Sequence, residues 1–388
     1  MKTSWLLVIS MFPAVFIAGC AGNGTSPLSQ SPANRNIDFD GKRNPGTGVL
    51  APLNAMRKTA EVANRPSGVA IWINQADKSQ SLILGLDDQA KSGSLTAFDV
   101  EGKVVQRVAE VNAGKAIDIA TDFAFGDQQV DIVVVAEQGS SRLRIFTINS
   151  KTRTLTDVSG TTGLPAESKG PVAVGLYKRP SDGAVFAIVA PAKGDKTKFL
   201  SQYRLVANRE RVDAKLVRQF GLTSGASPSL EISVAGISVD DELGYVYYSE
   251  PEKGIRKYWA NPDHESAEKE LAFFGQAGFS KSRQGISLLP TGPGQGYLLC
   301  VEQIGSASEF HVYSRSGSAN KPHDHRELGK VRTLADESIS VAVSGENFND
   351  DLPQGIVIMS NQQGRNFYIF DRRAIMDRIP ALPIPAPK

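Results

Sequence analysis

Two short stretches of this sequence carry side chains whose types and spacing could bind a metal ion. Residues 240–242 read Asp-Asp-Glu, and carboxylates are the ligands that calcium prefers. They stand just before Gly244 between two strand-like runs, so the chemistry of a hairpin turn explains them better. Residues 323–325 read His-Asp-His and could bind a transition metal, but their basic neighbours favour an exposed loop. Neither stretch therefore predicts a metal site.

Other familiar kinds of site are missing from the sequence. It contains no Ser-His-Asp set, no phosphate-binding Gly-Lys-Ser/Thr loop and no glycine pattern of a dinucleotide site. Its two cysteines, Cys20 and Cys300, provide neither a disulfide framework nor zinc-type spacing. The formal net charge is +2 with the basic residues scattered along the chain, which argues against nucleic acid as a partner.

The N-terminal segment has the pattern of a bacterial export signal. Lys2 precedes an apolar stretch at residues 5–18 that is too short to span a bilayer. The following Gly19-Cys20 resembles the lipoprotein box, in which the cysteine becomes the lipidated first residue; the alternative is an ordinary secretory signal with an incidental cysteine. We predict lipidation of Cys20 and anchoring to a membrane. Ala21, in place of Asp, favours the outer membrane of the cell envelope.

A strand-turn-strand pattern fills most of the remaining chain. At residues 233–258 two alternating runs flank an acidic turn and a third run follows Gly254, which indicates a β-meander. Similar units begin near residues 69, 117, 172, 285 and 339, roughly 50 to 60 residues apart, a spacing typical of propeller blades. Small sheets of this kind hide their faces by stacking radially. We predict an all-β fold, a six-bladed β-propeller of four-stranded antiparallel sheets.

These patterns divide the chain into four parts. Residues 1–19 are the predicted lipoprotein signal peptide, and the polar residues 20–62 form a flexible tether. The propeller takes residues 63–380, and the Pro-rich residues 381–388 form a tail. Within the tether, residues 56–62 fit either a strand or a helical turn.

Several short sequence motifs, in order along residues 65–375, resemble those of the β-propeller phytases, calcium-dependent hydrolases of inositol hexakisphosphate. The resemblance implies a cluster of calcium ions held by carboxylates at the top of a central channel, where it binds substrate phosphates and activates water. The matching motifs are Ala70-Ile71-Trp72-Ile73, Lys91-Ser92-Gly93, Phe98-Asp99-Val100-Glu101-Gly102-Lys103, Asp118-Ile119, Val130-Asp131-Ile132, Ala235-Gly236-Ile237-Ser238-Val239-Asp240-Asp241-Glu242 and Gly296-Tyr297-Leu298-Leu299.

Most acids that the resemblance implies for the calcium cluster are replaced in this chain. Neutral residues stand at nearly all of the corresponding positions, and a calcium ion needs six to eight oxygen ligands. The residues found there are Gly68 and Val69, Ala235, Ser282 to Gly285, Glu337 to Ser340, Val172 with Gly170 or Pro171, and Gln138 in place of an arginine.

A few charged residues remain as candidates near that end of the channel. Asp118, Glu250 and Glu302 are weak catalytic candidates; a strand acid capping a turn explains Asp118 as well, and a solvated loop explains Glu250. Lys91, Lys193 and Gln284 are candidate ligand-binding residues, since lysines attract anions.

Two functions of different class therefore stay open. In the first, the chain is a binding module of the cell envelope that needs no cofactor, whose ligand is a phosphate-bearing small molecule or an envelope protein. In the second, it is an active phytase that requires Ca²⁺. The loss of acids favours the first, and the family resemblance favours the second.

Overall fold

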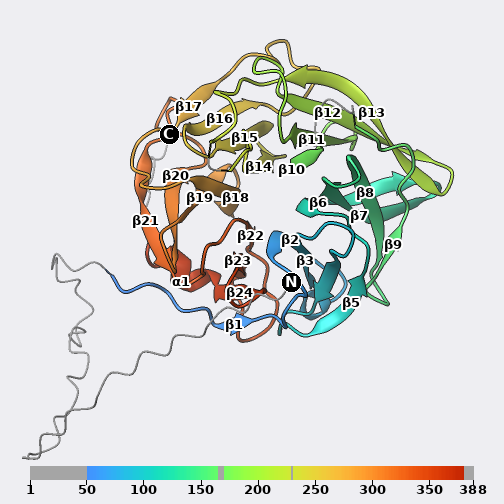
Figure 1. The fold of residues 1–388 in the computed structure, drawn as a ribbon, viewed down its shortest axis with the longest axis horizontal. Helices are drawn as coiled ribbons and strands as arrows, with labels where there is room; N and C mark the ends of the chain where they lie inside the picture. The colour runs from blue at the N-terminus through green and yellow to red at the C-terminus, as the bar shows by residue number, and fades with distance from the viewer. Residues whose placement is uncertain (1–49, 165–169, 229, 380–388) are drawn as a thin grey trace, which may run out of the picture. The chain divides into compact units, whose positions relative to one another are not determined.

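The computed structural model describes residues 50–164, 170–228 and 230–379, and within them strands form six four-stranded antiparallel sheets (Figure 1). The predicted signal peptide, Cys20 and the predicted Pro-rich tail lie outside the described residues. No helix within the described ranges is long and apolar enough to span a membrane.

Each of the first five blades follows the chain from the channel outwards. The first contains β2 (Pro66–Trp72), β3 (Leu82–Asp87), β4 (Leu95–Phe98) and β5 (Val104–Val108). The second contains β6 (Gly114–Phe125), β7 (Gln128–Glu137), β8 (Arg142–Asn149) and β9 (Thr154–Asp157). The third contains β10 (Pro171–Lys178), β11 (Val185–Pro191), β12 (Leu200–Asn208) and β13 (Arg211–Phe220). The fourth contains β14 (Gly236–Asp240), β15 (Tyr245–Glu250), β16 (Gly254–Trp259) and β17 (Ala272–Phe274). The fifth contains β18 (Arg283–Gly292), β19 (Gln295–Gln303), β20 (Ser308–Ser314) and β21 (Glu327–Thr333).

The sixth blade joins the two ends of the described chain. It contains β22 (Val341–Ser344), β23 (Ile356–Asn361) and β24 (Asn366–Asp371), and its outermost strand is β1 (Arg57–Lys58). Arg57 pairs with Ile369 and Lys58 with Tyr368. The stretch at 56–62 that fitted a strand or a helical turn thus contributes a strand, and residues 57 and 58 belong to the sheet.

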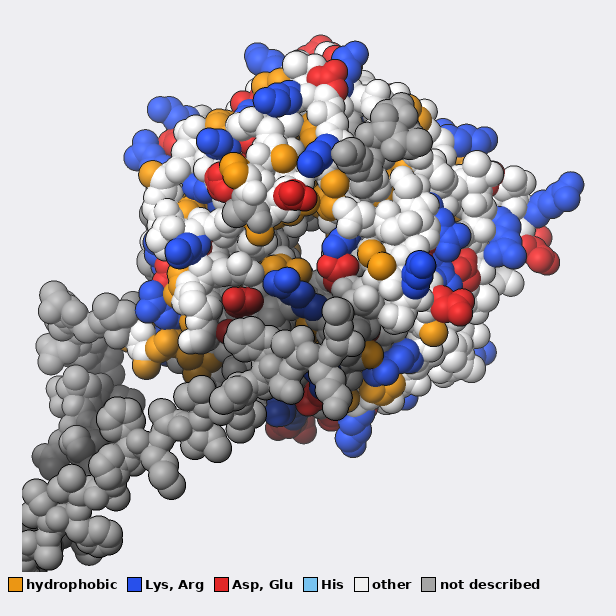
Figure 2. Space-filling view, in the orientation of Figure 1, with side chains coloured by type: hydrophobic (Ala, Val, Ile, Leu, Met, Phe, Trp, Pro, Cys, Tyr) orange, Lys and Arg blue, Asp and Glu red, His pale blue; other side chains and the backbone are white. Residues whose placement is uncertain are grey.

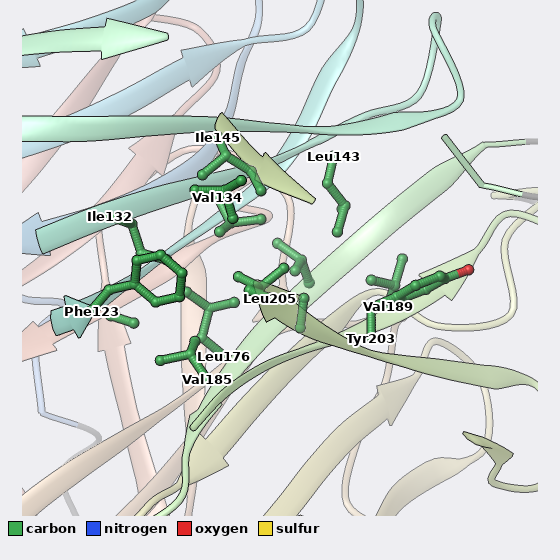
Figure 3. Close-up of a cluster of buried hydrophobic side chains, with 14 of the residues drawn as sticks. Phe123, Ile132, Val134, Leu143, Ile145, Leu176, Val185, Val189, Tyr203 and Leu205 are labelled. Atoms are coloured by element: carbon green, nitrogen blue, oxygen red, sulfur yellow. The ribbon is translucent and has the colours of Figure 1, made fainter. Parts of the chain in front are cut away.

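Six buried apolar clusters hold the ring together, one at each junction between neighbouring blades. Figure 3 shows the cluster between the second and third blades, where Phe123 and Ile132 meet Leu176 and Val185. The second strand of a blade packs against both neighbours, so β3, β15 and β23 consist almost wholly of buried residues. This explains why these strands read as continuous apolar runs.

The burial confirms the blade positions expected from the sequence. Trp72, Tyr247, Leu298 and Ile358 are all buried between blades, as predicted. Regular helix in the described chain is limited to the short α1 (Arg372–Met376) and the 3-10 turn η1 (Lys78–Gln80), so the predicted dominance of strand is confirmed. The first strands of successive blades, β2, β6, β10, β14, β18 and β22, lie next to one another around the centre of the ring.

Candidate functional site

A cavity of about 580 Å³ lies at one end of the central channel, where the first strands of all six blades begin. We call it the channel-mouth cavity. Figure 2 shows an opening at the centre of the ring, with basic and acidic side chains close to it. Each blade contributes at least one β-branched residue to the wall, among them Val69, Ile117, Val174, Ile237, Ile286 and Val341.

Basic side chains outnumber acidic ones around the channel-mouth cavity. Its described lining includes the cations Arg65, Lys115 and Lys193, and the carboxylates are Asp88 and Glu231. Nζ of Lys115 lies 2.5 Å from Oδ2 of Asp88, so one carboxylate is already paired. The cavity therefore has a formal excess of positive charge, which favours an anionic ligand.

The side chain of Gln284 adds an unpaired donor beside this cavity. Gln284 is 4% exposed, and its Nε2 is buried without a hydrogen-bond partner among the described residues. A buried amide donor without a partner is costly, and such groups usually find a water or a ligand. Gln284 and Lys193, two of the three predicted ligand-binding residues, both line the cavity.

The residues present do not fit a calcium cluster. Gly68, Val69, Ala235, Gln284 and Ser340 stand where the resemblance implies ligands, and all of them line the channel-mouth cavity. None of them carries a carboxylate, and the two described carboxylates at the wall fall far short of the oxygens that several calcium ions need. The described wall of the channel-mouth cavity therefore lacks the ligands for calcium-dependent chemistry.

Close packing of the strands also restricts what these positions can hold. A Cβ atom added to Gly68 would lie 2.9 Å from Cα of Ala116 in the next blade. At Gly285 the added atom would lie 2.9 Å from Cα of Ser340. Real Cβ atoms are rarely that close to backbone atoms, so a side chain at either position would push two blades apart.

Hydrogen bonds cross every junction between neighbouring blades close to the channel, and we call this set the inter-blade ring. Four of its donors are backbone or side-chain groups of the first strands themselves. In chain order, the bonds are Ser67 Oγ to Gly114 O (2.8 Å), Leu176 N to Asp118 Oδ2 (2.7 Å), Lys178 N to Asp241 Oδ1 (3.0 Å), Ser249 Oγ to Gln284 O (2.7 Å), Gly285 N to Ile339 O (3.0 Å) and Ser340 Oγ to Ser67 O.

Asp118 belongs to this inter-blade ring and does not line the channel-mouth cavity as described. Its carboxylate accepts the backbone N–H groups of Leu176 and Ile119. Burial raises the pKa of Asp118 to about 6, although the two backbone hydrogen bonds act in the opposite direction. Burial likewise raises the pKa of Asp241 to about 7; the hydrogen bond from Lys178 N opposes the shift, and the charges of Asp118 and Asp240 add to it.

Glu250 is the last residue of β15 and Glu302 the last but one of β19, and each contacts the connection that leads into the first strand of its blade. Glu250 is 1% exposed, accepts the backbone N–H of Ser224 at 3.0 Å and pairs with Arg256. Glu302 accepts the backbone N–H groups of Ser280 and Lys281.

Burial alone would raise the pKa of Glu302, but hydrogen bonds from His311, Lys281 and Ser280 hold it below its ordinary value. Neither Glu250 nor Glu302 is among the described residues of the cavity wall.

The same arrangement recurs in three other blades, which the sequence reasoning missed. Asp87, Glu137 and Asn361 end β3, β7 and β23, and all three are buried. Glu137 accepts the N–H of Asn112 at 2.7 Å, and Asn361 accepts that of Asp336 at 2.9 Å. Asp87 accepts the side-chain amide of Asn64 at 3.1 Å. The signal for this role in the sequence is a polar residue that closes a continuous apolar run.

Lys91 and the histidine stretch lie away from the cavity wall. Lys91 is exposed, and its backbone N–H donates to Oδ1 of Asn112. His325, expected on an exposed loop, is instead 5% exposed. Its Nδ1 lies 2.8 Å from the carbonyl oxygen of Ser314 and must donate, so Nε2 accepts from Nζ of Lys257 at 3.3 Å.

A transition metal does not fit at His325. Burial, with the charge of Lys257 second, lowers the pKa of His325 to about 4. Burial also lowers the pKa of Lys257 to about 7, and its ammonium lies 3.6 Å from the ring centre of Tyr245. A lysine amine therefore occupies the nitrogen that a metal would need.

Comparison of the sequence with known proteins identifies its relatives. The sequence model of the family described as Phytase matches residues 49–376. A protein of Bacillus subtilis (strain 168) described as 3-phytase is 23% identical over 305 residues, which cover 76% of this chain and 74% of that protein.

Among solved structures, a luciferin-regenerating enzyme matches with a TM-score of 0.46 at 15% identity, covering 81% of this chain and 91% of that one. A Bacteroides thetaiotaomicron protein of unknown function gives a TM-score of 0.46 at 11% identity, with coverages of 81% and 74%.

Proposed function

Because this chain belongs to the phytase family, we propose that its channel-mouth cavity binds a phosphate-bearing small molecule directly and does not hydrolyse it. One observation carries the proposal: the positions that the resemblance assigns to calcium ligands line the cavity as neutral side chains, while three cations remain. In the family, calcium supplies charge neutralisation of the phosphates and an activated water. Here the binding energy comes from the side chains of the chain itself.

Each cation has a distinct part in this binding. Lys193 contributes an ammonium group, and the donors of ammonium and guanidinium groups form charge-assisted hydrogen bonds to phosphate oxygens. Lys115 is held by Asp88, and Arg65 donates from Nε to Oε1 of Gln362 at 2.9 Å. These contacts position two of the three cations in advance, which lowers the entropy cost of binding. The unpaired Nε2 of Gln284 adds a neutral donor.

Calorimetric titration of inositol hexakisphosphate into the full chain, in calcium and in chelator, tests this proposal. We expect binding of similar affinity in both buffers and no release of phosphate. Lys193→Gln should weaken binding about tenfold, as expected for loss of one charge-assisted contact. Lys91→Gln is the matched control, because Lys91 does not line the cavity as described, and its affinity should be unchanged. Calcium-dependent phosphate release would establish the enzyme instead, and equal losses in both variants would place the ligand elsewhere.

The cellular place of this module is part of the same proposal. Cys20, at the end of an apolar leader, anchors the chain through lipid to the bacterial cell envelope, in the outer membrane. Metabolic labelling with radioactive palmitate should tag the protein, and Cys20→Ser should remain unlabelled and unprocessed. Equal labelling of both proteins would contradict the anchor. If an envelope protein co-purified with the chain in a one-to-one ratio and no phosphate ligand bound, the partner would be that protein and not a phosphate-bearing small molecule.

A further inference from the structure

A second group of convergent side chains lies in the fifth blade, outside the channel-mouth cavity. Glu302 on β19 pairs directly across the ladder with Glu309 on β20, and His311 follows two residues later on the same face. One ligand atom from each lies within 4.8 Å of the other two. His311 and Glu302 are almost completely buried, while the side chain of Glu309 is 12% exposed.

We propose that Glu302, Glu309 and His311 bind a divalent transition metal of the zinc type. The combination of an imidazole nitrogen and two carboxylate oxygens suits Zn²⁺, whereas Ca²⁺ selects oxygen ligands alone. Nε2 of His311 lies 2.7 Å from Oε2 of Glu302 and 4.0 Å from Oε1 of Glu309. Ligand atoms around a tetrahedral zinc ion are about 3.3 Å apart, given metal-ligand bonds near 2 Å, so small side-chain movements would complete the site.

The other ring nitrogen of His311 supports this assignment independently of the three ligands. Nδ1 lies 3.2 Å from Oε2 of Glu327, which comes from the next strand, β21. Metal-binding histidines commonly use the remaining ring nitrogen to contact a carboxylate in this way, which fixes the tautomer and the ring orientation. Phe279 stacks on His311 at a centroid distance of 3.5 Å and holds Nε2 toward the two glutamates.

The charges around the site are compatible with a bound dication. Glu302 and Glu309 are like charges directly opposite each other in the ladder, an arrangement that destabilises a sheet unless a positive charge lies between them. Lys330 and Arg332 approach Glu309 only to 3.4 Å, and their side chains are 36% and 43% exposed. Nζ of Lys330 has a second partner, the carbonyl oxygen of Gly278 at 2.6 Å, and the side chain of Arg332 can turn toward solvent. The partly exposed Glu309 leaves room for water as a further ligand. Zinc would displace the Nε2 proton, which passes to solvent.

The location indicates a structural role for the metal. The other oxygen of Glu302 accepts the backbone N–H groups of Ser280 and Lys281. Those residues belong to the connection that enters β18, the strand that supplies Gln284 to the channel-mouth cavity. A metal at Glu302 would therefore fix this connection, and its binding can be measured without any phosphate ligand.

The test uses the full chain without a polyhistidine tag, stripped of metal, then titrated with zinc or calcium chloride. We expect about one zinc ion per chain and a melting temperature raised by several degrees, with no effect of calcium. Glu309→Gln, whose side chain reaches the surface, should abolish the zinc-dependent rise. His264→Gln is the matched control and should keep it, since His264 stacks on Trp259 in another blade. Glu327→Gln should weaken zinc binding at least tenfold, as expected for loss of an outer carboxylate.

Anomalous X-ray scattering at the zinc edge gives the position directly, between β19 and β20. Absence of stoichiometric zinc binding would overturn the proposal. So would a zinc-dependent rise in melting temperature that survives in Glu309→Gln, because the ion would then bind elsewhere. If Glu309→Gln fails to fold by circular dichroism, the weakening in Glu327→Gln and the anomalous signal in the unmodified chain decide the question.

Discussion

The hydroxyl of Ser340 donates a hydrogen bond to the backbone carbonyl oxygen of Ser67 and thereby links the sixth blade to the first. Ser340 stands in the stretch where the resemblance implies acids, and its hydroxyl completes the inter-blade ring. Because this hydrogen bond already joins the sixth and first blades, the junction does not require a metal ion between them.

Ser340→Ala should lower the free energy of unfolding by about 0.5–1.5 kcal/mol, the usual net value of one hydrogen bond. Urea denaturation measures the change, and Ser181→Ala in an exposed turn is the control, expected near zero. On metal-stripped protein, added calcium should leave both melting curves in place. A calcium-dependent rise of several degrees would show that the ring depends on a metal after all.

Leu298 tests the packing between the fourth and fifth blades, where it is completely buried in one cluster with Tyr247 and Phe274. Leu298→Ala should cost about 2–5 kcal/mol, because it removes apolar contact and leaves a cavity. Chemical denaturation followed by circular dichroism measures this loss. A change near zero would mean that the blades do not pack at this residue.

Asp118 should make the stability of the protein depend on pH between 4 and 6. Its folded pKa of about 6 exceeds the ordinary value of 3.8, so the folded protein binds the proton more tightly than the unfolded chain does. The contribution is present in full below pH 4 and is lost as pH rises through 6. Wild type should therefore lose roughly 2–3 kcal/mol relative to Asp118→Asn across this range. Parallel stability curves for the two proteins would contradict the assignment.

Lys257 should give the opposite slope at higher pH. Its folded pKa of about 7 lies below the ordinary 10.5, so the unfolded chain binds more protons between these values and stability rises with pH. The neighbouring groups do not titrate in this range. The lowered pKa of His325 keeps its ring neutral above pH 7, and burial raises the pKa of Tyr245 and Tyr247. Denaturation at pH 7 and pH 9 should show this rise in wild type and its loss in Lys257→Met. An equal slope in both proteins would assign the effect to another group.

The fold was predictable because each blade repeats the same pattern of burial. Strands such as β15 and β19 are buried on both faces and appear as long apolar runs, so six repeats could be recognised. The fourth strands carry less information: β5 has no buried residue, and β17 has only three residues. β1 has two residues and no pattern, so only its pairing with β24 defines it.

The site was predictable only in part, because the geometry of loops is not encoded by residue type. Lys193 and Gln284 line the channel-mouth cavity, whereas Lys91, also a lysine in a connection, does not. Glu250 and Glu302 offer the right chemical groups for a site, but each accepts backbone N–H groups more than twenty positions away in the sequence. The group around His311 depends on the register of β19, β20 and β21, which no spacing along the chain reveals.

The composite sixth blade has a consequence for the order of events during synthesis. Arg57 can pair only after Ile369 has been synthesised, so the two residues that close the ring are separated in sequence by almost the entire domain. Such non-local closure slows folding, because the entropy of a very long loop is lost before the final contacts form. Until then β24 presents an open backbone edge, the kind of edge on which a second unfinished chain can add a strand. Chaperones that hold the chain extended would protect that edge until β1 meets β24.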